Sequence, residues 1–289
     1  MGVDRSLPSE QVLSLFILGL RVLIKYSDLE LRQLLVANFG AMASPDADLL
    51  PDLEFSVQRG AAPRSFSLMR RGGAARDVQN SSDLLYFLDK EMTLELQRRR
   101  GDLLFLHSAA LAWQGKAYLL AADSGAGKST TTWALLHHEF GYLSDELSPI
   151  DIRSLQVFPY PHAVCFKRPP PQPYPLSGGA IHLGRTIHVP VQALPSQTIP
   201  QPLPLGGVFL LSYRPHLAAP ALRAIGHAEA SARLYVTALN ALAHANKGLD
   251  AVVRIVENAP CFAVSSGGLQ ETCNLIRATL KQTADTSRA

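Results

Sequence analysis

Hydrophobic positions in the first hundred residues recur at two different spacings. Residues 29–40 carry apolar side chains at helical spacing and end on Gly40, a residue that is common just after a helix. Residues 53–58 and 65–70 alternate apolar and polar side chains on either side of a turn at 60–63. The pattern therefore predicts one helix followed by two antiparallel strands.

A long amphipathic helix is expected to close this region. Its apolar face recurs every three or four residues and consists of Leu84, Leu85, Leu88, Met92 and Leu96. Ser82 or Asp83 is the expected N-cap, and the helix is expected to extend through Arg100, where basic side chains suit a helix C-terminus. Residues 1–100 are thus predicted to form a small N-terminal α+β region.

The pattern changes near residue 101, where apolar runs become continuous enough for strands that are buried on both faces. Such runs span residues 103–111, 117–121, 140–147 and 205–213. Helical patterns occur at 130–136, 229–245 and 269–281. A turn at Gln114-Gly115 joins the first two strands, and residues 249–256 fit either a helix or a strand. Residues 101–289 are therefore predicted to form an α/β domain.

Proline is concentrated in one part of this second region. Residues 159–204 contain 12 of the 20 prolines in the chain. Proline lacks a backbone N–H and breaks regular helices and central strands, so this segment is expected to form loops and edge strands.

Composition narrows the function classes. The 289 residues are 47% hydrophobic and 18% charged, which describes a globular chain, and a net charge of +3 is too small to indicate nucleic acid binding. The cysteines at 165, 261 and 273 lack metal-ligand spacing and are expected to be reduced thiols. The early apolar stretch at 12–20 is too short to span a bilayer and carries no cleavage site. We expect the protein not to associate with membranes and to be located in the cytoplasm.

The strongest functional signal is a glycine-bearing loop between a predicted strand and a predicted helix. It reads Ala122, Asp123, Ser124, Gly125, Ala126, Gly127, Lys128 and Ser129, with Thr130 following in the helix. Backbone N–H groups of such a loop can surround a polyphosphate, and the helix N-terminus adds partial positive charge. Lys128 is expected to reach the β- and γ-phosphates and Ser129 to bind Mg²⁺. Residues 122–130 are thus predicted to bind ATP with Mg²⁺, although Ala122 stands where the motif usually has glycine.

Two further elements bring candidate chemistry to the same sheet edge. His107 lies 21 residues before Lys128, and Asp145-Glu146 end a predicted strand 17 residues after it. Phosphoryl transfer needs a phosphate cradle, a metal ligand and a group that positions the acceptor oxygen. Asp145 and Glu146 are therefore candidate metal ligands beside Ser129. The alternatives are a buried core histidine at 107 and a helix cap or turn former at 145.

The chain resembles the HPr kinase/phosphorylase family, and in particular the HPr-kinase-related proteins. The matching residues are Leu106-His107-Ser108, the loop from Asp123 to Ser129, and Ser144-Asp145-Glu146, where the family usually has a second aspartate in place of Glu146. The resemblance implies the P-loop kinase core that the family shares with phosphoenolpyruvate carboxykinase. It also implies that His107 and Asp145 form the catalytic couple, with Asp145 deprotonating a serine hydroxyl and Lys128 contacting the phosphates.

Three functions follow from these residues. The first is an ATP-dependent kinase that phosphorylates a hydroxyl, in line with the family a serine of a peptide or protein. The second is a non-catalytic or ATP-hydrolysing sensor module, which needs only the phosphate cradle and the metal. The third is a small-molecule kinase that acts on a metabolite such as free serine. Lys167 and Arg168 either contact the acceptor or form a solvated pair, and a homo-oligomer is left open.

Overall fold

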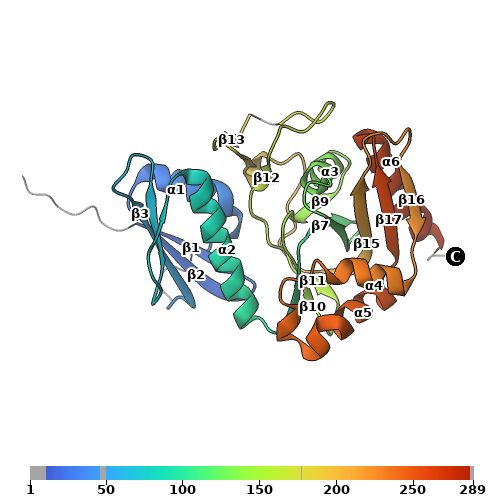
Figure 1. The fold of residues 1–289 in the computed structure, drawn as a ribbon, viewed down its shortest axis with the longest axis horizontal. Helices are drawn as coiled ribbons and strands as arrows, with labels where there is room; N and C mark the ends of the chain where they lie inside the picture. Colours follow the sequence, from blue (N-terminus) through green and yellow to red (C-terminus); the bar gives the residue numbers. More distant parts are fainter. Residues whose placement is uncertain (1–10, 46–49, 177, 287–289) are drawn as a thin grey trace, which may run out of the picture.

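The computed structural model describes residues 11–45, 50–176 and 178–286, which form a mixed α/β structure with several sheets (Figure 1). The first sheet has the strand order β1-β2-β3-β4-β5. Its strands are β1 (Gln11–Ile17), β2 (Leu20–Tyr26), β3 (Leu53–Arg59), β4 (Phe66–Arg70) and β5 (Arg76–Val78). The pair β3–β4 is antiparallel, as the alternating pattern predicts. The β1–β2 hairpin was not predicted; it turns at Leu18 and Gly19, whose positive φ values of 52° and 82° suit a two-residue turn.

Two helices pack on this sheet, α1 (Leu29–Phe39) and α2 (Ser81–Arg99), and the short 3₁₀ helix η1 (Gly40–Met42) follows α1. Both helices were predicted, and the expected apolar face of α2 is buried. The predicted cap of α2 was wrong. Asn80 is the N-cap, because its backbone is extended and its Oδ1 accepts a hydrogen bond of 2.9 Å from the Asp83 N–H, whereas Ser82 and Asp83 are already in the first helical turn.

The second sheet carries the candidate site. Its strand order is β6-β10-β11-β15-β8-β7-β9, with β17 also paired to β15 and β16 paired to β17. The first strands are β6 (Leu103–Leu106), β7 (Ser108–Trp113), β8 (Lys116–Ala122), β9 (Gly141–Ser144) and β10 (Ser148–Asp151). The others are β11 (Gln156–Val157), β15 (Leu203–Tyr213), β16 (Ala221–Ala224) and β17 (Cys261–Ser266). Parallel pairing joins β8 to β15 and β15 to β17, while β7 runs antiparallel to β8 and to β9.

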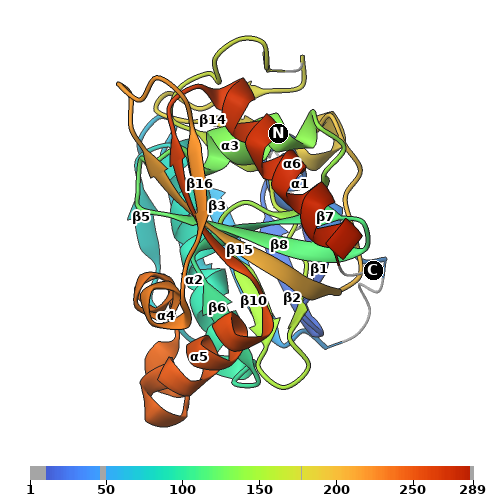
Figure 2. The same ribbon diagram turned by 90° about the vertical axis from the view of Figure 1, so that its right-hand side faces the viewer.

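Helices cover both faces of this sheet (Figure 2). One face packs against α3 (Lys128–Leu136) and α6 (Leu269–Thr286), and the other against α4 (His227–Tyr235) and α5 (Leu249–Asn258). Strand β8 shows why its sequence is continuously apolar. Tyr118 and Leu120 belong to the hydrophobic cluster that includes α3 and α6. Leu119 and Ala121 belong to the cluster that includes α4 and α5. Since successive side chains of a strand point to opposite faces, both faces must be apolar.

The proline-rich segment forms loops and a small sheet in the order β12-β14-β13, which confirms the expectation for residues 159–204 outside position 177. The strands are β12 (Val164–Phe166), β13 (Ile181–His182) and β14 (Ile187–Val189), followed by the 3₁₀ helix η2 (Val191–Ala193). Among the described residues, no helix is both long enough and apolar enough to cross a bilayer. The three cysteines are free, and Cys165 is only half-buried.

Two predicted elements were wrong. The run 103–111 is two strands, β6 and β7, which separate at His107 and pair with different neighbours. The helix predicted over 229–245 ends at Tyr235, and the chain then continues through the 3₁₀ helices η3 (Ala241–Ala243) and η4 (Ala245–Gly248). The reason is tertiary: Leu239 N–H donates to the Phe105 carbonyl (2.8 Å), so this segment follows β6 instead of remaining helical. Residues 249–256 lie in α5 and are helical.

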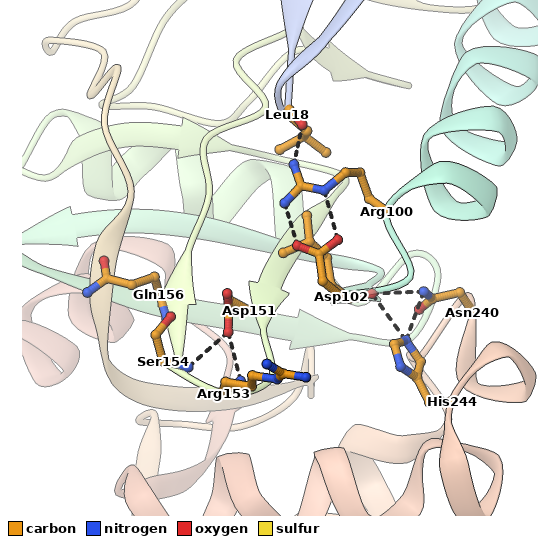
Figure 3. Close-up of polar contacts among 10 residues, drawn as sticks. Leu18, Arg100, Asp102, Asp151, Arg153, Ser154, Gln156, Asn240 and His244 are labelled. Atoms are coloured by element: carbon orange, nitrogen blue, oxygen red, sulfur yellow. Dashed lines mark hydrogen bonds and ion pairs between the residues drawn. The ribbon is translucent and has the colours of Figure 1, made fainter. Parts of the chain in front are cut away.

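Polar contacts fix the junction between α2 and β6 (Figure 3). Arg100 forms two hydrogen bonds with the Asp102 carboxylate, at 2.8 and 2.6 Å, and donates a third to the carbonyl of Leu18. Asn240 binds the Leu103 carbonyl from the other side at 2.9 Å. Hydrophobic residues from β6 also pack with those of the first sheet in one cluster. The division of the chain into two domains at residue 100 therefore stays a prediction.

Candidate functional site

The glycine-bearing loop joins the end of β8 to the start of α3. Gly125 and Gly127 have φ values of 83° and 88°, in the left-handed region that favours glycine, while a Cβ at either position would meet no atom within 4 Å. Backbone conformation, not lack of space, is therefore what requires glycine here. Gly127 is the N-cap of α3 and provides no side-chain cap, so the first N–H groups of the helix remain available to a ligand.

Lys128 is the first residue of α3 and points to the end of β9. Its side chain is only 8% exposed, and its ammonium donates a hydrogen bond to the backbone carbonyl of Asp145. Nζ also lies 3.3 Å from Glu146 Oε2 and 3.9 Å from Asp145 Oδ1. His107 Nδ1 lies 3.3 Å from the same Glu146 oxygen. The structure thus brings the four candidate residues His107, Lys128, Asp145 and Glu146 together.

Sheet topology explains this convergence. Because β7 is antiparallel to both β8 and β9, the carboxyl ends of β8 and β9 lie at the same edge as the start of β7. His107 precedes β7, the glycine loop follows β8, and Asp145 follows β9. The break in the run 103–111 therefore places His107 at the site, where its backbone N–H donates to the Thr237 carbonyl at 2.8 Å. The juxtaposition expected from the spacing is confirmed.

Asp145 is the most unusual group at the site. Its side chain is fully buried, and neither carboxylate oxygen has a hydrogen-bond partner within the described part of the chain. Burial raises the pKa of Asp145, and the neighbouring Lys128 ammonium opposes that increase. A buried carboxylate without hydrogen bonds is costly, and here the Lys128 ammonium and the nearby Ser129 hydroxyl are the groups that favour its charged form.

The remaining predicted residues lie around this pair. Asp123, Ser124 and Gly125 are exposed, whereas Ala122, Ala126, Gly127, Ser129 and Thr130 are half-buried. In the residues that the structure describes, no group of three or more His, Cys, Asp or Glu side chains could hold a metal alone. A Mg²⁺ ion would nevertheless fit the oxygen donors of Ser129, Asp145 and Glu146, because Mg²⁺ usually takes only one or two carboxylates and completes its shell with phosphate and water.

Sequence reasoning missed His162, whose side chain is buried between β11 and β12 and whose backbone carbonyl accepts a hydrogen bond from the Tyr142 hydroxyl. A single histidine between Pro161 and Ala163 carries no motif that would have revealed it. Lys167 and Arg168, just after β12, are exposed.

Comparison with solved structures gives a distant likeness to a kinase/phosphatase structure. No protein-family model and no curated protein matches the chain. The structure of the HPr(Ser) kinase/phosphatase from Coxiella burnetii is similar over 64% of this chain and 97% of that chain, with 12% sequence identity and a TM-score of 0.33. Because this likeness is so weak, the function of the chain has to be inferred from the residues at the site.

Proposed function

We propose that the protein is an ATP-dependent kinase that transfers the γ-phosphate of ATP to a hydroxyl group. The observation that carries this proposal is the buried Lys128, which links the glycine loop to the fully buried Asp145, with its Nζ 3.9 Å from Asp145 Oδ1. The arrangement provides a phosphate cradle and a carboxylate at one sheet edge, as phosphoryl transfer requires.

In this proposal, the backbone N–H groups of the loop and of the first turn of α3 bind the phosphates as a P-loop. Lys128 moves from the Asp145 carbonyl to the β- and γ-phosphates, which are stronger hydrogen-bond acceptors for an ammonium. Ser129, Asp145 and Glu146 would hold Mg²⁺, which neutralises charge on the phosphates when bound.

Asp145 is the proposed general base. It takes the proton of the acceptor hydroxyl while the hydroxyl oxygen forms a bond to the γ-phosphorus and the bond from that phosphorus to the bridging oxygen of ADP breaks. A carboxyl whose pKa is raised by burial is a better base near neutral pH than an exposed one, provided it remains ionised, and Lys128 favours the ionised form. His107 contacts Glu146 and not Asp145, so we assign it a positioning role on Glu146.

The proposed acceptor is a serine of a peptide or protein, bound beside the loops at 159–204 in a reduced compartment such as the cytoplasm. These loops follow β9 to β11 directly and flank the site, and loops on a rigid scaffold commonly carry recognition. Free serine is the small-molecule alternative.

The test replaces Asp145 by asparagine, which keeps the shape of the side chain and removes the base. We expect Asp145→Asn to bind MgATP within a few-fold of the wild type and to lose about 10²- to 10⁴-fold in phosphoryl transfer. Transfer is measured with labelled ATP and a panel of peptides, proteins and free serine. The control is Glu146→Gln, for which a smaller loss is expected.

Two outcomes would contradict the proposal. Label that appears only as free phosphate with every acceptor would favour the ATP-hydrolysing sensor. A near wild-type transfer rate in Asp145→Asn would remove the role of base from Asp145.

A further inference from the structure

A small cavity lies beside the glycine loop, between the second sheet and α4. Its volume is about 120 Å³, and it is lined by the ends of β8 and β15, by Asp123, and by α4 and the two residues that follow it. Cavities that hold drug-sized ligands measure about 300–1,000 Å³, so this one can hold only a small group.

Two opposite charges line this cavity. Among the described residues around it, Arg233 is the one basic side chain and Asp123 the one acidic side chain. Arg233 belongs to the last turn of α4, and its side chain is 31% exposed. The guanidinium is therefore partly shielded from water, which strengthens its attraction for an anion.

The hydrogen bonds that Arg233 makes to the described residues are long. Its Nη2 lies 3.3 Å from the Leu210 carbonyl oxygen and 3.5 Å from Ser212 Oγ. Its Nη1 lies 3.4 Å from Glu229 Oε1, but Arg223 binds the same carboxylate with two bonds of 2.7 and 3.0 Å. Charge-assisted hydrogen bonds are normally about 2.7–2.9 Å long, so Arg223 is the main partner of Glu229. The charge of Arg233 is thus left available for a further anion.

The cavity also adjoins the candidate site. The backbone carbonyl of Thr237, in the cavity wall, accepts a hydrogen bond of 2.8 Å from the His107 N–H. His107 Nδ1 in turn lies 3.3 Å from Glu146 Oε2. Asp123 is the second residue of the glycine loop. A ligand in the cavity therefore lies against the start of the loop and against the residue that binds the backbone of His107.

We infer that this cavity is an acceptor subsite in which Arg233 binds a carboxylate of the acceptor. A guanidinium can form two parallel hydrogen bonds with a carboxylate, and this geometry fixes the orientation of the bound group. The carboxylate has two possible sources: a free hydroxy amino acid, whose ammonium would meet Asp123, or an acidic group next to the serine of a peptide. The role in transfer rests on the proposed kinase function, whereas the binding of a carboxylate by Arg233 does not.

The first experiment measures binding without catalysis, by following the arginine Nε–Hε resonances of the full chain by NMR. The probes form two matched pairs: L-serine with L-serinamide, and a capped serine–aspartate dipeptide with its serine–asparagine counterpart. Inorganic phosphate is the fifth probe. We expect the charged member of one pair to shift the Arg233 resonance and its neutral counterpart to leave it in place. The pair that responds identifies the source of the carboxylate.

Two results of this titration would overturn the inference. No shift with any probe would show that Arg233 only attaches α4 to β15. A shift with phosphate as large as that with the carboxylates, at equal concentration, would assign the cavity to the nucleotide and not to the acceptor.

The second experiment measures specificity in phosphoryl transfer. We expect kcat/KM for the charged member of the pair to exceed that for its neutral counterpart about 10- to 100-fold, because a hydrogen bond to a charged group is worth a factor of this size. Arg233→Gln should abolish this preference and leave KM for ATP within a few-fold. Arg233→Lys, which keeps the charge without the planar fork, should retain part of the preference.

Arg254→Gln is the matched control. Arg254 is an exposed residue of α5 that also donates to a backbone carbonyl, that of Arg153 at 2.8 Å, but it does not line the cavity. Arg254→Gln therefore removes the same charge and should keep the preference for the carboxylate.

Equal kcat/KM for both members of the pair in the wild type would overturn the acceptor subsite. A preference that persists in Arg233→Gln, or that is lost equally in Arg254→Gln, would do the same. A protein whose Arg233 resonance responds to a carboxylate but which transfers no phosphate would refute the proposed function and leave the binding of the carboxylate standing.

Discussion

Lys128 separates two acidic side chains at the candidate site that would otherwise repel each other. Its ammonium contacts the Asp145 carbonyl and lies 3.3 Å from Glu146 Oε2. We expect Lys128→Met to weaken MgATP binding at least about tenfold, because a charge-assisted hydrogen bond contributes about 1.5–3 kcal/mol. Removing the partner of a buried charge should also lower the free energy of unfolding by about 3–5 kcal/mol. Calorimetric titration and denaturant unfolding measure the two effects.

The control for this substitution is Lys116→Met. Lys116 is an exposed lysine at the start of the same strand that leads into the loop. Lys116→Met should change neither the affinity for MgATP nor the free energy of unfolding appreciably. Wild-type nucleotide affinity in a folded Lys128→Met protein would reject the assignment of the loop as a phosphate cradle.

Single residues of the site differ in how far the sequence reveals them. His107, Lys128 and Asp145 could be named in advance because the loop motif and the spacing of buried strands imply one sheet edge. His162 could not, since no motif marks it and only the folded chain buries its ring beside Tyr160. The contact of His107 with Glu146 could not be predicted either, because residue spacing does not distinguish Glu146 from its neighbour Asp145.

At the scale of elements, the start of α2 is defined by one side chain. Asn80 Oδ1 accepts from the Asp83 N–H, and Asn80 Nδ2 donates to the Asp83 carboxylate, both at 2.9 Å. We expect Asn80→Ala to lower the free energy of unfolding by about 1 kcal/mol, as is typical for loss of an N-cap. Ser81→Ala, in the next residue, is the control for denaturant unfolding. A larger loss in Ser81→Ala than in Asn80→Ala would show that Asn80 is not the effective cap.

Elements that follow local periodicity were predictable, and those set by distant partners were not. The helices α1, α2 and α6 and the strand β15 have strong apolar patterns of their own. The end of α4 depends instead on β6: Asn240 accepts from the Phe105 N–H at 2.9 Å, and Leu239 donates to the Phe105 carbonyl. These bonds satisfy backbone groups of an edge strand, so they outweigh the helical pattern of residues 236–245.

At the scale of the whole molecule, the first sheet and its helices meet the rest of the chain close to the candidate site. Asn38 of α1 accepts from the Ala163 N–H through its backbone and contacts His188 through its side chain. The Tyr160 hydroxyl donates to Asp89 of α2 at 2.7 Å. Ala163 and Tyr160 lie on either side of His162 in the sequence, so contacts with the N-terminal helices hold both sides of this segment.

These contacts make stability depend on pH through His188. Burial lowers the pKa of this histidine from 6.5 to about 4, and His162 adds to the decrease. The unfolded chain therefore binds a proton at higher pH than the folded chain does, and stability must fall as the pH decreases from about 6.5 to about 4. A shift of this size corresponds to about 3 kcal/mol.

His188→Gln lacks the titrating group, so it isolates this contribution from the carboxylates. The difference in free energy of unfolding between the wild type and His188→Gln should favour the wild type most above pH 7 and shrink by about 3 kcal/mol at pH 4. Denaturant unfolding at several pH values measures it, and a difference that stays constant across this range would show that His188 of β14 is not buried as a neutral ring against α1.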